Sequence, residues 1–312
     1  MGRLTIVAAP PILIRMVTHS PTDRHTDLIA MRDGLTLSVD VFNADGSPPL
    51  LFAHGFGQTR GAWGGTAQAL ADAGYRCVTF DARGHGESGR VTGGEYHMEQ
   101  FVEDLTTLAH MQPEPPVLVG ASMGGLLGLV VAGEFDPRAF RALVLVDITP
   151  RWESAGVERI LAFMKAHPDG FADYAEAAEQ IAQYLPQRRE RKSEEQLKPL
   201  LREGPDGRLR WHWDPALLDG LVSESERYQP RLFSAAAKLQ VPLLLISGGR
   251  SDVVSHATVN EFLQLVPHAR HVELPQATHM LAGDANDAFT REIARFVRDL
   301  ESAGVRHNAG AA

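Results

Sequence analysis

The chain has 312 residues, of which 44% are hydrophobic, and a formal net charge of −9 at pH 7. This apolar content can fill a sizeable core, and the length fits one large α/β domain with an insertion. The acidic balance argues against a nucleic-acid partner, because phosphate binding relies on clustered Lys and Arg. No apolar run approaches the ~20 residues of a transmembrane helix, so we expect no membrane partner either.

Cys77 is the single cysteine, so no intrachain disulfide can form. It lies in an apolar run, which predicts a buried structural thiol. The apolar N-terminal stretch Leu4–Ile14 is interrupted by prolines and lacks a small-residue cleavage pattern, which argues against a signal peptide. We therefore expect a cytoplasmic protein whose termini, residues 1–26 and 301–312, are partly flexible.

Short apolar runs bounded by turn residues predict strands, and helical periodicity predicts helices between most of them. In chain order the expected strands cover residues 27–31, 35–42, 50–53, 76–80, 117–119, 142–146, 243–247 and 271–273. The expected helices cover residues 62–73, 98–111, 123–135, 257–266 and 285–300. The first two strands adjoin each other, which indicates an antiparallel hairpin. The later alternation predicts a mainly parallel sheet covered by helices on both faces.

The strand signal stops between Pro150 and about Leu239, where the sequence becomes helical, polar and punctuated by prolines. Helical patterns cover residues 158–166, 172–184 and 194–202. We interpret residues 151–239 as a helical cap inserted into an α/β core. That core would comprise residues 27–150 and 240–300.

The strongest motif is Gly120-Ala121-Ser122-Met123-Gly124, a G-x-S-x-G sequence between an expected strand and an apolar helix. A serine on such a sharp strand-to-helix turn has an exposed hydroxyl. Side chains at Gly120 and Gly124 would collide with neighbouring strands or with the turn itself. The helix N-terminus favours negative charge developing at this place. Ser122 is therefore predicted as a nucleophile.

From about residue 27 to 300 the chain resembles the α/β-hydrolase fold superfamily, and it is similar to bacterial cap-bearing serine carboxylesterases. The likeness to the esterases includes Leu145–Pro150 and Arg210–Asp214. The resemblance implies an oxyanion hole in the segment His54-Gly55-Phe56-Gly57. The backbone amides of Phe56 and Met123 would be its two donors, and His54 would shape the loop.

A serine hydroxyl needs an adjacent base, and the base needs an orienting acid. His279 follows a short strand and precedes the last helix, which fits the base, although Thr278 stands where the family usually has glycine. Asp252 follows an apolar strand and a Gly-Gly turn, which fits the acid. Asp147, at the end of the preceding strand, is the rival, and we prefer Asp252. The competitors for the base by residue type are His256, His268 and His271.

Gly84–Gly89 matches G-x-G-x-x-G, but no helix opens directly after it, so we expect no dinucleotide. No cluster of His, Cys and Asp has convincing metal spacing, so we expect neither a metal nor another cofactor.

These residues predict a serine carboxylesterase that acts through an acyl-enzyme on a small-molecule ester with small to medium hydrophobic groups. Four tryptophans are candidates for lining the substrate pocket, although they could equally serve packing: Trp63, Trp152, Trp211 and Trp213. A lactonase or thioesterase would use the same triad. A cofactor-free haloperoxidase or perhydrolase and a non-catalytic ligand-binding receptor remain alternatives, and a homodimer is left open.

Overall fold

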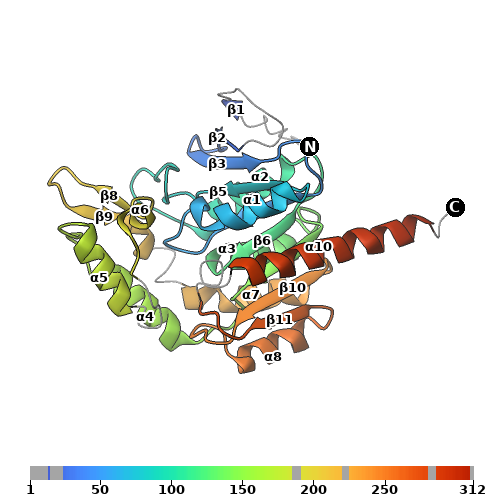
Figure 1. Ribbon diagram of the computed structural model, residues 1–312. Coiled ribbons are helices and arrows are strands. Elements are labelled where there is room, and N and C mark those ends of the chain that lie inside the picture. The colour runs from blue at the N-terminus through green and yellow to red at the C-terminus, as the bar shows by residue number, and fades with distance from the viewer. Residues whose placement is uncertain (1–12, 15–23, 185–190, 220–224, 280–285, 310–312) are drawn as a thin grey trace, which may run out of the picture.

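The computed structural model describes residues 13–14, 24–184, 191–219, 225–279 and 286–309. Within them a nine-stranded sheet has the order β1-β2-β3-β5-β4-β6-β7-β10-β11 (Figure 1). From β5 to β11 all neighbours are parallel, whereas β1, β2 and β3 are antiparallel. The strands are β1 Leu13–Ile14, β2 His25–Ala30, β3 Thr36–Phe42, β4 Pro49–Ala53, β5 Arg76–Phe80, β6 Val117–Ala121, β7 Ala142–Val146, β10 Leu243–Gly248 and β11 Arg270–Leu274.

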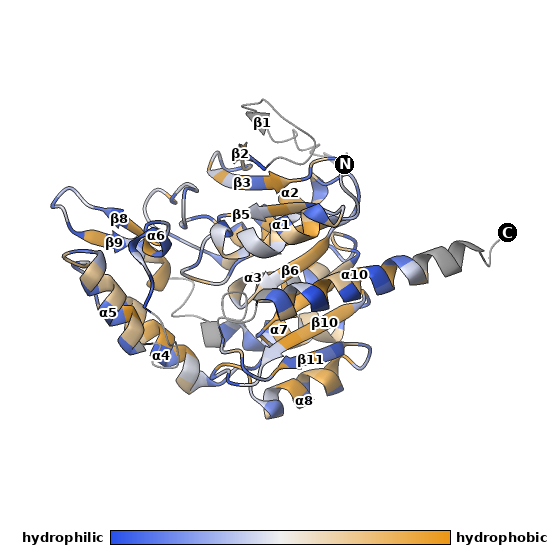
Figure 2. Cartoon of the chain, viewed as in Figure 1, coloured by the Kyte–Doolittle hydropathy of each residue, from blue (hydrophilic) through white to orange (hydrophobic). Residues whose placement is uncertain are grey.

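Helices cover both faces of the sheet. Neighbouring residues of a strand point to opposite faces, and both sets are apolar here, so each face needs a cover. In β4, Leu50 and Phe52 face the cluster that contains α1 and α10, whereas Leu51 and Ala53 face α2 and α3. Figure 2 shows the central strands as mostly apolar, as expected for parallel strands that are buried on both faces. The covering helices are α1 Gly64–Asp72, α2 Met98–His110, α3 Met123–Val130, α7 Gln229–Ala237, α8 His256–Leu265 and α10 Asn286–Ala309.

The predicted α/β-hydrolase fold is confirmed, with differences at the two ends of the chain. Leu13 pairs with Ile29, so part of the expected flexible N-terminus joins the sheet as an edge strand. At the other end, α10 continues to Ala309 through most of the expected flexible tail. Cys77 is fully buried as predicted, and burial raises the pKa of its thiol.

The chain leaves the sheet between β7 and β10. Figure 1 shows the elements from α4 to β9 gathered to one side of the sheet, and we call residues 154–218 the cap segment. They are α4 Ser154–Lys165, α5 Tyr174–Tyr184, α6 Glu194–Leu197, β8 Leu201–Glu203, β9 Leu209–Trp211 and a 3-10 turn, η3, Pro215–Leu218. A helical cap was predicted, and besides its helices the segment contains an antiparallel hairpin of β8 and β9, which was not predicted. The cap segment has its own small apolar cluster, formed by Phe171, Ala177, Ile181, Leu197, Leu201 and Leu209.

The last part of the predicted cap belongs to the helical layer of the core. Helix α7 packs against the π-helical turn η2, Val131–Phe135, which continues α3. A Cβ atom on Gly133 would lie 2.1 Å from the carbonyl oxygen of Ala235, so the two backbones are in direct contact. The core therefore resumes before the predicted boundary at residue 239.

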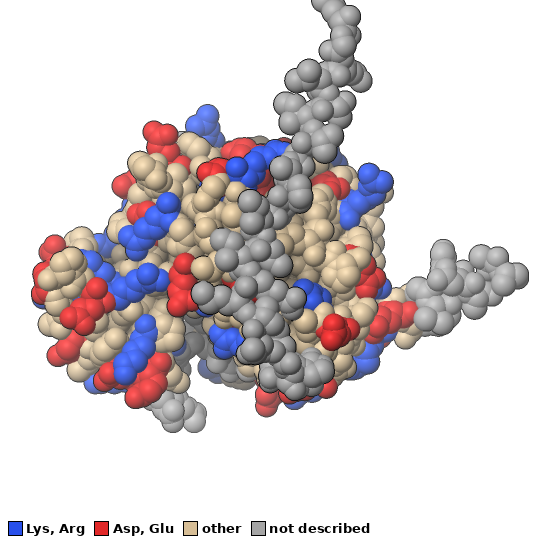
Figure 3. Space-filling view, turned by 90° about the horizontal axis from the view of Figure 1, so that it is seen from above, with Lys and Arg blue, Asp and Glu red and all other residues tan. Residues whose placement is uncertain are grey.

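On the face shown in Figure 3, Lys and Arg side chains are interspersed with Asp and Glu. Where described residues are visible on this face, no continuous basic patch is seen. Among the described helices, none combines the length and the apolar composition needed to cross a lipid bilayer.

Candidate active site

Ser122 lies on a sharp turn between β6 and α3. Its backbone has φ +46° and ψ −117°, a sparsely populated conformation that costs on the order of 1–3 kcal/mol. A Cβ atom on Gly120 would lie 2.7 Å from Gly124, and one on Gly124 would lie 2.3 Å from the carbonyl oxygen of Ala53. The predicted need for glycine at both positions is therefore confirmed, and the turn presents the serine at the start of a helix.

The strand order brings two other loops to the same edge of the sheet as Ser122. Strand β6 lies between β4 and β7, with Ala53 opposite Gly120 and Ala121 opposite Val146. The Ser122 amide donates to the carbonyl oxygen of Val146 at 3.2 Å. The loop after β4, the serine after β6 and Asp147 after β7 are consequently neighbours, as the carboxyl ends of adjacent parallel strands must be.

Asp147 is fully buried and accepts hydrogen bonds on both carboxylate oxygens. The Nδ1 atom of His279 lies 2.7 Å from its Oδ2, which also accepts from the Ser251 hydroxyl. The Gly248 amide donates to its Oδ1 at 2.8 Å. A buried carboxylate with this set of donors holds the imidazole ring in one orientation.

The prediction that Asp252 orients His279 is wrong in this structure. The Asp252 carboxylate is 38% exposed and forms an ion pair with Arg159 of α4. Helix α4 also packs on the Asp252 backbone, because a Cβ on Gly156 would lie 2.0 Å from its carbonyl oxygen. The loop after β10 therefore turns Asp252 outward, and its inward residue is Ser251, which the sequence analysis missed.

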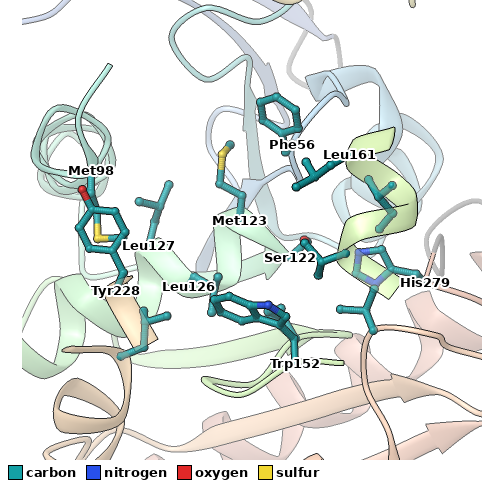
Figure 4. Close-up of a pocket in the computed structure, with 15 residues that line it drawn as sticks. Phe56, Met98, Ser122, Met123, Leu126, Leu127, Trp152, Leu161, Tyr228 and His279 are labelled. Carbon is teal, nitrogen blue, oxygen red and sulfur yellow. The ribbon is translucent and has the colours of Figure 1, made fainter. Parts of the chain in front are cut away.

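Ser122 and His279 line the same cavity, and Figure 4 shows their side chains beside each other. Because the carboxylate accepts the proton on Nδ1, Nε2 of His279 is left as the basic nitrogen. The other candidate histidines lie elsewhere. His256 bonds Glu273, His268 donates to a backbone carbonyl, and His271 bonds Ser247.

The loop after β4 lies against Ser122, since a Cβ on Gly55 would be 3.2 Å from the Cβ of Ser122. His54 supports this loop as predicted. Its Nδ1 donates to the Gly55 carbonyl at 2.8 Å, and its Nε2 accepts from the Ala82 amide at 2.9 Å. Within the described residues, the turn and loop hydrogen bonds leave the Phe56 amide without a backbone acceptor. Met123 is the first residue of α3, so its amide also precedes the hydrogen-bonded part of the helix.

The cavity has a volume of about 130 Å³, which is room for roughly four water molecules at about 30 Å³ each. No charged side chain is among the described residues that line it (Figure 4). Two of the lining residues are Ser122 and His279, and the others are Phe56, Met98, Met123, Leu126, Leu127, Ile148, Trp152, Val157, Ile160, Leu161, Tyr228, Leu232 and Val253. Core strand ends and cap helix α4 thus enclose a mostly apolar space directly beside the serine.

Of the four tryptophans predicted for the pocket, Trp152 lines it and the other three do not. Trp63 is fully buried in the core and stacks on Phe289, with 6.0 Å between ring centroids. Trp211 packs edge-on against Phe171 in the cap cluster, and Trp213 packs against Phe56 of the loop after β4. Aromatic composition could not separate lining from packing, because both roles require apolar rings.

Among the described residues, no group of three or more His, Cys, Asp or Glu side chains is placed to hold a metal ion. Gly84–Gly89 forms a closed loop in which the Gly84 amide donates to the Gly89 carbonyl at 2.8 Å. The next helix, α2, begins only at Met98. The segment therefore lacks the helix N-terminus that a dinucleotide site requires.

The profile of the family described as alpha/beta hydrolase fold matches residues 48–285. The chain is 30% identical over 247 residues to the 3-hydroxybutyrate-oligomer hydrolase of Cupriavidus necator, covering 74% of this chain and 82% of that protein. It is 27% identical over 283 residues to the sn-1-specific diacylglycerol lipase ABHD11 of Mus musculus, covering 84% and 85%. The solved structure of E-2-(acetamidomethylene)succinate hydrolase superposes with a TM-score of 0.76 at 22% identity, covering 88% of this chain and 100% of that one.

Proposed function

Because the chain belongs to the alpha/beta hydrolase fold family, we propose that it is a serine hydrolase that cleaves carboxylic esters of small to medium hydrophobic substrates. One observation carries the proposal. Ser122 stands on a strained turn beside the His279–Asp147 pair and opens into an apolar cavity. This arrangement supplies a nucleophile, a base and an orienting acid in one place.

In the proposed reaction, Nε2 of His279 takes the hydroxyl proton of Ser122 while Oγ attacks the ester carbonyl. The amides of Phe56 and Met123 donate to the oxyanion that forms. Asp147, in place of the predicted Asp252, stabilises the imidazolium. The tetrahedral intermediate then collapses, the alcohol leaves with the proton from His279, and an acyl-enzyme remains. Water activated by His279 attacks this acyl group, which releases the acid and restores the serine.

The lining of the cavity supports a neutral hydrophobic substrate. No Lys or Arg is among its described lining residues. A carboxylate brought into such a space would lose its hydration without gaining a counter-charge. The two related proteins act, by their names, on 3-hydroxybutyrate oligomers and on diacylglycerol, which are both esters.

The first test is hydrolysis of p-nitrophenyl esters with two- to twelve-carbon acyl chains by wild type and Ser122→Ala. We expect turnover in wild type and a loss of at least ~10³-fold in the variant. Ser302→Ala makes the same chemical change on the exposed side of α10 and should behave as wild type. Full activity in Ser122→Ala would refute the mechanism.

Comparison of p-nitrophenyl butyrate with the p-nitrophenyl monoester of succinate tests the substrate class, since the acyl chains have equal length. We expect kcat/KM to be at least ~10-fold higher for the butyrate, because only the succinate carries a charge into the cavity. Equal values would contradict a neutral substrate. If wild type cleaved no ester, thioesters and lactones of the same length would come next, then haloperoxidase and perhydrolase assays. Tight binding without turnover would instead support a receptor.

A further inference from the structure

Three buried histidines lie side by side behind the oxyanion loop. The ring centroids of His54 and His85 are 5.1 Å apart, and those of His85 and His212 are 6.1 Å apart. Each residue is at most 2% exposed. His54 and His85 belong to core loops after β4 and β5, whereas His212 belongs to the cap segment directly after β9. The cluster therefore joins the cap to the core next to the proposed active site.

Each of these histidines binds a peptide group of the oxyanion loop. His54 Nδ1 donates to the Gly55 carbonyl at 2.8 Å. The Gly57 amide donates to His85 Nε2 at 3.2 Å. His212 Nε2 lies 3.1 Å from the Gly57 carbonyl and donates to it. His54 and His85 thus fix the two peptide planes that flank Phe56. His212 fixes the next plane, Gly57–Gln58, whose amide donates to the Gly55 carbonyl at 3.1 Å.

The second nitrogen of His212 holds the cap segment to the core. The Gly86 amide donates to its Nδ1 at 2.8 Å, so the ring accepts on one side and donates on the other. This pattern requires a neutral ring, and burial lowers the pKa of His212 to about 4. Burial likewise lowers the pKa of His54, and it lowers that of His85 well below its ordinary value. All three rings are therefore neutral at pH 7.

Other cap side chains converge on the same loop. The Trp213 ring lies 5.6 Å from the Phe56 ring, centroid to centroid. Gly57 has φ +74°, and a Cβ there would lie 2.2 Å from the terminal methyl group of Met164 in α4. The Asp214 amide donates to the Gly84 carbonyl at 2.7 Å. The cap segment thus contacts the backbone that presents the Phe56 amide as well as the substrate cavity.

We propose that His212 is a positioning residue of the oxyanion hole, which couples docking of the cap segment to the orientation of the Phe56 amide. The inference rests on the proposed function, in which that amide stabilises the oxyanion. Without the bond from His212, the Gly57–Gln58 peptide can rotate, and the Gln58 amide then no longer holds the Gly55 carbonyl, which shares a peptide plane with the Phe56 amide. The donor is then misplaced in the transition state, and because the ground state gains less from it, kcat falls more than KM rises.

The two bonds of His212 can be separated by substitution. In His212→Gln the side-chain amide nitrogen reaches the place of Nε2, so the donation to Gly57 is retained and the bond from Gly86 is lost. In His212→Asn the side-chain oxygen takes the place of Nδ1, so the bond from Gly86 is retained and the donation to Gly57 is lost. The variants are matched controls, because each keeps one hydrogen bond of the wild type.

We expect kcat on p-nitrophenyl esters to fall by about 10- to 100-fold in His212→Asn, with KM changed less than about three-fold. His212→Gln should stay within about five-fold of wild type in both parameters. The melting temperatures of the two variants should be lowered by similar amounts, since each loses one buried bond. If the two variants have similar melting temperatures, a difference in kcat between them is due to the hydrogen bond to Gly57.

Equal kcat in the two variants, or a lower kcat in His212→Gln than in His212→Asn, would overturn the proposal in favour of simple cap docking. The rate at which a fluorophosphonate modifies Ser122, followed by intact mass, provides a readout without ester turnover. It should slow in His212→Asn alone. If wild type reacted with this probe but cleaved no ester, the proposed esterase function would be refuted. The modification rates of the two variants would still test the role of His212. A wild type that does neither would refute both proposals.

Discussion

The sheet core and the cap segment both reach the candidate site, but they reach it by different means. Ser122 and Asp147 directly follow neighbouring strands, and backbone hydrogen bonds to Val146 and Ile246 set their positions. The cap contributes side chains instead, such as Leu161 in the cavity lining and His212 behind the oxyanion loop. The chemistry thus depends on strand register, which allows little change, whereas the substrate space and its support depend on side chains that can be exchanged.

The largest expected effect on kcat distinguishes Asp147, which is buried in the core, from Asp252, which pairs with cap helix α4. Asp147→Asn should lower kcat by about 10⁴-fold, because the amide favours the wrong tautomer of His279 and cannot stabilise its charged form. Asp252→Asn makes the same change where the carboxylate only pairs with Arg159 at the surface. It should change kcat less than about three-fold. Steady-state kinetics of both variants on one ester test this prediction. A large loss of kcat in Asp252→Asn alone would restore Asp252 as the orienting acid.

Substitution of two tryptophans compares how much packing in the core and in the cap segment contributes to the free energy of unfolding. Trp63→Ala removes a fully buried core ring and should lower the free energy of unfolding by about 3–5 kcal/mol. Trp211→Ala removes a half-buried ring of the small cap cluster and should cost roughly half as much. Both indole nitrogens are without a hydrogen-bond partner, so the comparison isolates packing. Urea unfolding measures it, and a larger cost at Trp211 would show that the cap contributes more to stability than its size indicates.

A third prediction concerns the support of the acid. Ser251→Ala removes one donor from Asp147 and leaves those from His279 and Gly248, so kcat should fall only about 10-fold. Ser247→Ala is the matched control, because its hydroxyl bonds His271 and does not reach the carboxylate. Equal losses in the two variants would mean that Ser251 acts on the fold and not on Asp147.

The smallest expected effect is the acid sensitivity that the histidine cluster confers. The unfolded chain binds a proton at each histidine below its ordinary pKa of about 6.5, whereas burial prevents this in the folded state. Stability should therefore fall as pH decreases below about 6.5, and for His212 the loss continues to its folded pKa of about 4. His212, with its folded pKa of about 4, accounts for about 1.3 kcal/mol between pH 7 and 5.5. His212→Gln should remove about one such increment in urea unfolding at the two pH values, and an unchanged loss would contradict the assignment of a neutral His212.

Much of the core could be predicted because its signals are local. Apolar runs indicated the parallel strands, and the glycines around Ser122 are required by contacts at one turn. The choice between Asp147 and Asp252 was not local, since both follow a strand and only the path of the loop after β10 directs Ser251 inward and Asp252 outward. The β8–β9 hairpin was missed because its strands have three residues each, too few to show alternation. The role of His212 depends on contacts more than 120 positions away in sequence, as the bond from Gly86 shows.

His279 differs from the other proposed catalytic residues in the strand that carries it. Ser122 and Asp147 follow interior strands, but His279 follows β11, the last strand of the sheet order, where all residues except Leu274 are half-buried or exposed. Edge elements with few buried contacts open before the rest of a fold. Local opening of β11 would withdraw the base while the serine and the acid stay in place. Activity should therefore disappear at a lower denaturant concentration than the one that unfolds the interior strands. It should return on dilution without a global refolding step.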